Sequence, residues 1–197
     1  MAKRSNGSID DEDMVDITDW TAGDTGTGVS SQVTFDSKSC MKFDNGSAGG
    51  TYRYQDIGSY GTRTVISLNV YAHLLTGAGF YFRTNDGATN FWLKWDPNGN
   101  MYVYDGSGYN SAGSITLDTW EEWTFDINWT AETVDVYRAR ILLSAGMDIS
   151  YSAAGTEGLV DMFLDQGAAN LLFYIDWFKA GDDFTPSVGY SQAILIT

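Results

Sequence analysis

The stretch Phe91–Tyr104, FWLKWDPNGNMYVY, holds two runs of alternating side chains on either side of a short polar segment. Large apolar residues occupy every second position up to Trp95, and the alternation resumes at Met101. A period of two is typical of a β-strand that buries one face. The segment between the runs, Asp-Pro-Asn-Gly-Asn, is rich in residues that favour tight turns. The stretch therefore predicts two strands joined by a turn.

The same turn has the appearance of a metal-binding loop, because Asp96, Asn98 and Asn100 are spaced like calcium ligands. An EF-hand loop also needs a bidentate Glu at its twelfth position and a helix on each side. Here alternating runs flank the segment and no such Glu follows. We therefore interpret the segment as a turn.

Period-two alternation recurs through most of the 197 residues, between clusters of Gly, Asn, Asp and Ser. Aromatic residues form 15% of the chain, and its 22 Gly and 2 Pro fit aromatic strands joined by Gly-rich turns. The pattern predicts an all-β protein, a two-sheet sandwich. The expected strands are Val29–Phe35, Ser39–Phe43, Thr51–Gln55, Arg63–Ala72, Gly79–Thr84, Asn90–Trp95, Asn100–Tyr104, Trp120–Asn128, Thr133–Arg138, Ile141–Ala145, Val160–Asp165 and Asn170–Lys179. Asp105–Ser114 is expected to be a turn cluster.

Composition excludes several classes of partner. The chain carries 26 acidic and 11 basic side chains, a net charge of −15, which repels nucleic acid and anionic membrane surfaces. One cysteine, Cys40, rules out an internal disulfide, and zinc-ligand spacing is absent. Neither a secretory signal nor a membrane-spanning apolar run is present in the sequence.

Four stretches resemble the concanavalin A-like lectin/glucanase group, particularly its laminin G-like jelly-roll modules. They are DITDWTAG from position 16, DSKSCMKF from 36, GSITLDTWEEWTFDINWTAETVDVYRARILLSAG from 113 and LLFYIDWFKAG from 171. The resemblance implies a two-sheet antiparallel jelly-roll β-sandwich over residues 14–181, with an N-terminal arm at 1–13 and a C-terminal arm at 182–197. The chain departs from the group at Tyr137–Arg140, where Arg-Ala-Arg follows the tyrosine in place of Asp-Gly.

The acidic residues do not match the catalytic motif of the glucanase members, Glu-x-Asp-x-x-Glu. Glu121, Glu122 and Asp126 have the wrong spacing, and Asp161 and Asp165 lack a third carboxylate. His73 and Cys40 are the only residues of their types, so no catalytic triad can be assembled around them. We therefore expect a non-catalytic module.

A binding face is a better candidate. If one face of the middle strands forms the core, the opposite face mixes flat aromatic rings with amide and cationic donors, as a sugar-binding face does. Burial beneath the terminal segments and an interface with another subunit are the alternatives. The expected carbohydrate-binding residues are Asn69, Tyr71, Tyr81, Arg83, Trp92, Lys94, Tyr102 and Tyr104.

The resemblance also implies a structural calcium ion between the chain start and the last strand. Carboxylate oxygens suit Ca²⁺. A solvated acidic N-terminus is the alternative. The candidate ligands are Asp11, Asp13, Asp16 and Asp176.

An extracellular type of fold without a secretory signal fits a virion protein, which is assembled in the host cytoplasm. We therefore predict a bacteriophage capsid decoration or tail-associated protein, with a homo-oligomer, other virion proteins and glycans as partners. The apolar end QAILIT fits addition of a strand to a neighbour. The alternative is a free carbohydrate-binding module of an extracellular surface protein.

Overall fold

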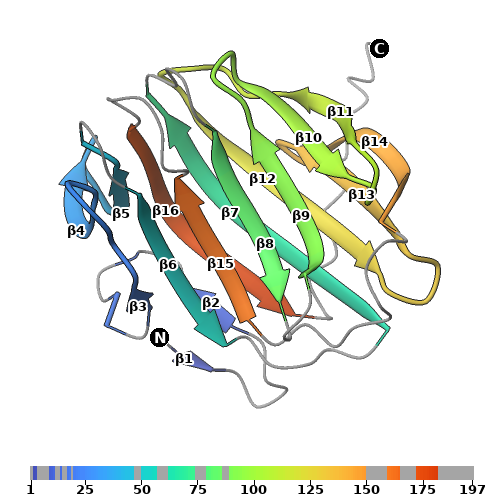
Figure 1. Cartoon of the computed structure of the whole chain (residues 1–197), viewed down its shortest axis with the longest axis horizontal. Helices are drawn as coiled ribbons and strands as arrows, with labels where there is room; N and C mark the ends of the chain where they lie inside the picture. Colours follow the sequence, from blue (N-terminus) through green and yellow to red (C-terminus); the bar gives the residue numbers. More distant parts are fainter. Residues whose placement is uncertain are drawn as a thin grey trace, which may run out of the picture.

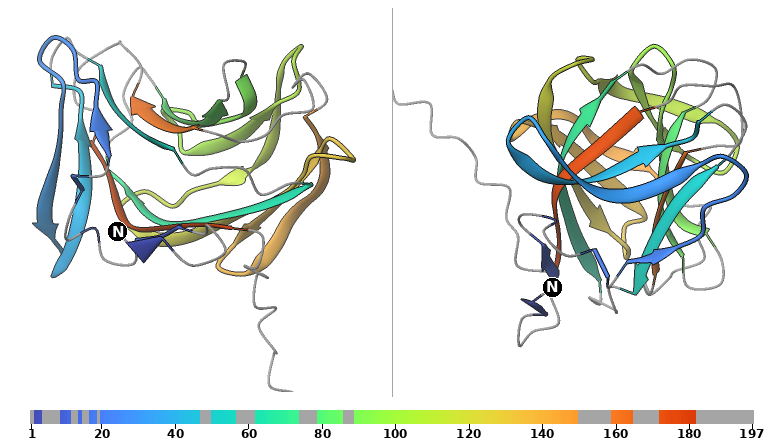
Figure 2. Two further views of the ribbon diagram at one scale, coloured as in Figure 1. Left: turned by 90° about the horizontal axis from the view of Figure 1, so that it is seen from below. Right: turned by 90° about the vertical axis from the view of Figure 1, so that its left-hand side faces the viewer.

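The computed structural model describes residues 2–3, 9–11, 14, 17–18, 20–46, 50–56, 62–73, 79–85, 89–149, 159–164 and 172–181. Within these ranges the regular elements are all strands. A helix long and apolar enough to cross a membrane is not found in this part of the chain. The strands form two antiparallel sheets that face one another (Figure 1, Figure 2). The predicted jelly-roll sandwich is therefore confirmed.

Sheet A has nine strands, in the order β1-β2-β16-β7-β12-β13-β14, with β5 also pairing with β16 and β4 pairing with β5. Their bounds are β1 Ala2–Lys3, β2 Ile9–Asp11, β4 Val29–Phe35, β5 Lys38–Asp44, β7 Arg63–Ala72, β12 Trp120–Asn128, β13 Thr133–Arg138, β14 Ile141–Asp148 and β16 Leu172–Gly181.

Sheet B has seven strands, in the order β11-β10-β9-β8-β15-β6-β3. The left view of Figure 2 shows that this sheet bends, so that its outer face is concave. The strand bounds are β3 Thr21–Ala22, β6 Thr51–Asp56, β8 Phe80–Asn85, β9 Thr89–Trp95, β10 Asn100–Tyr104, β11 Tyr109–Ser114 and β15 Leu159–Leu164.

Strand β16 lies in sheet A between β7 and two strands from the first part of the sequence, β5 and β2. Along one edge it pairs with β7, and along the other it pairs first with β5 and then with β2. The register with β7 shifts between Ile175 and Trp177, which places a bulge at Asp176. Because β2 pairs with β16, Ile9–Asp11 belongs to the sheet, although it lies in the predicted N-terminal arm. The predicted C-terminal arm, 182–197, lies outside the described residues.

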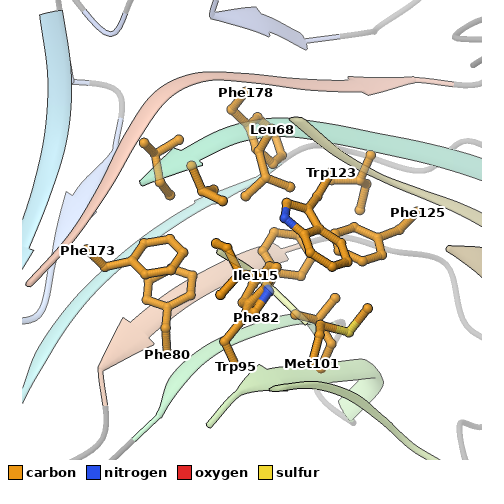
Figure 3. Close-up of a cluster of buried hydrophobic side chains, with 14 of the residues drawn as sticks. Leu68, Phe80, Phe82, Trp95, Met101, Ile115, Trp123, Phe125, Phe173 and Phe178 are labelled. Atoms are coloured by element: carbon orange, nitrogen blue, oxygen red, sulfur yellow. The ribbon is translucent and has the colours of Figure 1, made fainter. Parts of the chain in front are cut away.

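The core lies between the sheets and is built from aromatic rings (Figure 3). Phe80 of sheet B stacks on Phe173 of sheet A, with ring centroids 3.8 Å apart and an angle of 4° between the ring planes. Trp95 meets Trp123 edge to face, with centroids 5.7 Å apart. All four side chains are fully buried. Burial of large aromatic surfaces is the main stabilising contribution in such a core.

The β9–β10 connection is the predicted turn. One carboxylate oxygen of Asp96 accepts hydrogen bonds from the backbone N–H groups of Asn98 and Asn100, at 2.8 and 2.9 Å. Gly99 has a φ of +80°, a left-handed conformation that favours glycine. A Cβ atom there would also lie 2.9 Å from the backbone oxygen of Ile115.

The hairpin between β13 and β14 is where the sequence departs from the group it resembles. Ala139 and Arg140 form its two-residue loop and both have positive φ, 48° and 67°. Primed turns of this kind suit strand twist and usually carry Asn-Gly. Arg138 lies 3.9 Å from Glu121, and Arg140 lies 3.4 Å from Glu122. Both arginines therefore contact acidic residues of β12.

One predicted turn is wrong. Tyr109–Ser114, expected within a turn cluster, forms the edge strand β11 and pairs with β10. Most of its side chains are exposed and Ala112 is its buried residue, so the strand shows little apolar alternation. Edge strands that bury little are commonly polar, which hides them from a periodicity search.

Candidate functional site

The concave outer face of sheet B carries a group of aromatic and cationic side chains, which we call the aromatic face. Its members lie on β8, β9, β10 and β11, and on β6 beyond the intervening strand β15. Tyr109 is 39% exposed, and the remaining members are half-buried. The members are Tyr52, Tyr54, Tyr81, Arg83, Trp92, Lys94, Tyr102, Tyr104 and Tyr109.

The centre of the aromatic face alternates rings and cations across β8 and β9. Tyr81 pairs with Lys94, and Arg83 pairs with Trp92, so each cation has a ring directly opposite it. The guanidinium carbon of Arg83 lies 5.8 Å from the centroid of the Trp92 ring. The Lys94 ammonium lies 5.6 Å from the Tyr81 centroid. These distances fit cation–π attraction, which holds each cation beside a ring.

The rings of β10 and β11 extend this arrangement. Tyr104 contacts Trp92 on one side and Tyr109 on the other, with centroid distances of 6.0 and 5.1 Å. The Lys94 ammonium lies 4.8 Å from the Tyr109 centroid, so it sits between a ring of β8, Tyr81, and a ring of β11, Tyr109. Flat rings and adjacent donors thus share one surface.

The loops at the rim position the β10 tyrosines. The Tyr102 hydroxyl donates a hydrogen bond to Asp96, at 3.3 Å. Burial raises the pKa of Tyr102, and the Asp96 carboxylate adds to that rise. Burial opposes ionisation of Asp96 itself, but hydrogen bonds from Asn100 and Asn98 outweigh burial and lower its pKa.

Asp105 organises the loop between β10 and β11. Its carboxylate accepts hydrogen bonds from the backbone N–H groups of Ser107 and Gly108 and from the Asn110 side chain, at 2.8, 2.7 and 2.7 Å. These bonds, with that from Ser107 foremost, hold the pKa of Asp105 far below its usual value. The loop brings Tyr109 back beside Tyr104, with which it pairs.

Two of the predicted carbohydrate-binding residues lie elsewhere. Asn69 and Tyr71 are on β7, so they belong to the outer face of sheet A, on the opposite side of the sandwich. Tyr71 packs against Phe35 and Trp120, with centroid distances of 4.9 and 5.5 Å. The single predicted face is therefore corrected to two faces. Tyr81, Arg83, Trp92, Lys94, Tyr102 and Tyr104 do lie together on sheet B.

Three members of the aromatic face were missed from the sequence. Tyr52 and Tyr54 stack on each other, with centroids 5.4 Å apart, and Tyr109 belongs to the unrecognised strand β11. The alternation Thr-Tyr-Arg-Tyr-Gln in β6 was a usable signal, because it places both tyrosines on one face. Arg53 points inward between them and donates hydrogen bonds to the backbone oxygens of Trp20 and Ser30.

Asp176 is the described member of the predicted calcium site. Its carboxylate is buried, at 6% exposure, and accepts hydrogen bonds from Lys38 at 2.6 Å and Asn69 at 3.0 Å. The side chain of Asp11 and all of Asp13 and Asp16 lie outside the described residues, although the backbone of Asp11 pairs with Phe178. No group of three potential ligands occurs in the described part of the chain.

The acidic side chains considered for catalysis also have partners. Arg63 donates two hydrogen bonds to Asp126, at 2.7 and 2.6 Å, and Glu122 contacts Arg140. Burial raises the pKa of Cys40 to about 11, so this thiol stays protonated at neutral pH. His73 contacts Asp118 at the surface of sheet A.

No protein-family profile and no curated protein sequence matches the chain. Solved structures with the same fold do match. A sialidase has a TM-score of 0.74 at 11% identity, over 89% of this chain and 18% of the sialidase. The Emp46p carbohydrate recognition domain, in its metal-free form, has a TM-score of 0.63 at 10% identity, over 94% of this chain and 100% of that domain.

A third structure, the β-glucanase of Bacillus licheniformis, has a TM-score of 0.62 at 13% identity, over 91% of this chain and 100% of the enzyme. The Emp46p domain has also been solved in a potassium-bound form. At these identities the likeness establishes the fold alone, a jelly roll shared by lectin domains and by enzymes. The chain spans about a fifth of the sialidase and the full length of the other two.

Proposed function

We propose that this chain is a non-catalytic module that binds carbohydrate on its aromatic face. The observation that supports this proposal is the array of half-buried rings, interspersed with Arg83 and Lys94, on the concave side of sheet B. The Emp46p domain, which shares the fold, is a carbohydrate recognition domain.

The chemistry of the face suits a sugar. The C–H-rich face of a pyranose ring packs on flat aromatic rings, and the rings here are held in place by neighbouring side chains, so little conformational entropy is lost on binding. Arg83 and Lys94 supply hydrogen-bond donors between the rings, where sugar hydroxyls would lie. Tyrosine and tryptophan combine an apolar ring, on which a sugar can pack, with a polar group that can form hydrogen bonds.

A glycan array, followed by titration calorimetry of the best ligand, tests the proposal. Trp92→Ala should abolish binding, because Trp92 contacts Tyr81, Arg83 and Tyr104 at the centre of the face. Trp177→Ala is the matched control, since Trp177 is a half-buried tryptophan of sheet A. Equal loss in both variants, or no ligand on the array, would refute the proposal.

A structural role in a virion, as a capsid decoration or tail-associated protein, is the second candidate function. It is favoured by the edge strand β14, where Ile141 and Leu142 are 67% and 48% exposed. Exposed apolar residues on a sheet edge fit a contact with a second copy of the chain. Light scattering on the purified chain tests this role: a monomer at all concentrations counts against it, and an oligomer that Ile141→Lys dissociates supports it.

A further inference from the structure

The lysine at the centre of the aromatic face, Lys94, differs from five of the cations of sheet A. In sheet A each of five cations contacts a carboxylate: Lys38 with Asp176, Lys42 with Asp44, Arg63 with Asp126, Arg138 with Glu121 and Arg140 with Glu122. Lys94, by contrast, forms no ion pair with any described residue. Its ammonium contacts the rings of Tyr109 and Tyr81, at 4.8 and 5.6 Å from their centroids.

This arrangement is unexpected in a chain with 26 acidic and 11 basic side chains. With such an excess of acids, a lysine that pairs with none of the described carboxylates is available to an outside anion. Arg83 lies diagonally across from Lys94 on the neighbouring strand, but Asp161 of β15 is directly opposite Arg83. The contact with an outside anion is therefore assigned to Lys94.

We propose that the aromatic face selects acidic carbohydrates, whose carboxylate or sulfate groups contact Lys94 while the sugar rings pack on Trp92 and the tyrosines. The inference rests on the proposed carbohydrate-binding function and names its ligand class. Hydrogen bonds between charged partners are stronger than those between neutral ones, and rings that exclude water strengthen them further.

The net charge of −15 does not prevent this selection. Repulsion between a distant surface carboxylate and an acidic ligand is screened beyond about 8 Å at physiological ionic strength. A cation in direct contact with the ligand is screened much less. Lys94, in direct contact with the ligand, would therefore attract an acidic group more strongly than distant carboxylates repel it.

Matched pairs of oligosaccharides provide the test. The first pair is the hexamer of galacturonic acid and its methyl ester, which keeps the rings and hydroxyls but removes the charges. The second pair is sulfated and unsulfated lactose. We expect the acidic member of at least one pair to bind about tenfold or more tightly than its neutral partner, as measured by titration calorimetry. The pair that discriminates identifies carboxylate or sulfate as the recognised group.

Variants assign the preference to its residues. Lys94→Gln should remove most of the acidic preference and Lys94→Arg should retain it, with circular dichroism confirming the fold of both. Lys179→Gln is the control, because the Lys179 ammonium also lies over a ring, 5.5 Å from the centroid of Trp177, but on sheet A. It should leave the preference unchanged.

The outcomes separate the two proposals. If both members of each pair bind equally, or if only neutral glycans bind on the array, the acidic selection is overturned and carbohydrate binding stands. Equal effects of Lys94→Gln and Lys179→Gln would also overturn it, because overall charge would then account for the preference. If nothing binds, in the pairs or on the array, carbohydrate binding fails as well.

Discussion

Replacing Lys38 with Met removes the ammonium group that neutralises Asp176. In the natural chain the two groups are 2.6 Å apart, and Asp176 is 6% exposed. The methylene stem of Lys38 is largely preserved in methionine, so the substitution mainly deletes the charge. Asp176 would then keep the hydrogen bond from Asn69, at 3.0 Å, but would be a buried carboxylate without a counter-charge.

The expected magnitude follows from the burial of each partner. Breaking a fully buried ion pair by removing one partner costs about 3–5 kcal/mol. The side chain of Lys38 is 37% exposed, so water already screens part of the attraction. We therefore expect Lys38→Met to lower the free energy of unfolding by about 2 kcal/mol. Asp176→Asn should cost only about 1 kcal/mol, because Lys38 can turn its ammonium toward water.

Urea denaturation of the natural chain, both single variants and the double variant measures the coupling. In the Asp176→Asn background, Lys38→Met should cost about 0.5 kcal/mol or less, since no carboxylate is left to neutralise. Lys42→Met is the control, because the side chain of its partner Asp44 is 32% exposed, against 9% for the side chain of Asp176. The reasoning is refuted if Lys38→Met costs the same in both backgrounds.

Three further predictions concern the loops and the metal. Because the pKa of Asp105 is lower in the folded chain than in the unfolded chain, where it is near 3.8, its carboxylate stabilises the fold above about pH 4, and this stabilisation is lost as the pH falls further. Asp105→Asn should therefore make the free energy of unfolding depend less on pH below about pH 4. An unchanged acid transition would contradict this prediction. Gly99→Ala should lower the free energy of unfolding, measured by urea denaturation, by about 2 kcal/mol, because residue 99 has a φ of +80° and an added Cβ would crowd the backbone oxygen of Ile115. A decrease below about 0.5 kcal/mol would contradict this prediction. Because Lys38 already neutralises Asp176, calcium should change the melting temperature of the natural chain and of Asp176→Asn equally; a rise confined to the natural chain would assign Asp176 as a calcium ligand.

The sequence predicted the strands well where each strand buries one face. Arg63–Ala72, Asn100–Tyr104 and Trp120–Asn128 have the bounds expected from alternation. Alternation reports burial, so it works wherever burial determines the residue type. Strand β11 was missed for the same reason, because it buries little beyond Ala112.

The candidate site was predicted less completely. Alternation separates inward from outward side chains, but it does not state to which of two sheets a strand belongs. Tyr71 and Tyr81 therefore looked equivalent in the sequence, although one lies on sheet A and the other on sheet B. Sheet membership depends on pairings between distant segments, such as β7 with β16, and a single sequence does not reveal these pairings.

The pairing of β16 has a consequence for how the protein is made. This strand contacts β5 near the start of the chain, as in the pair Leu172–Asp44, and it also pairs with β7 through the middle of sheet A. On the ribosome, β5 cannot pair with β16 until Leu172–Ile175 has been synthesised, and β7 cannot complete its pairing until Gly181 has been added. Contacts so distant in sequence slow folding, and the unpaired strands meanwhile expose aromatic surface that favours aggregation. We therefore expect the sandwich to close only after β16 has left the ribosome and its yield in cells to depend on chaperones, with nascent chains that end before Leu172 remaining open to protease.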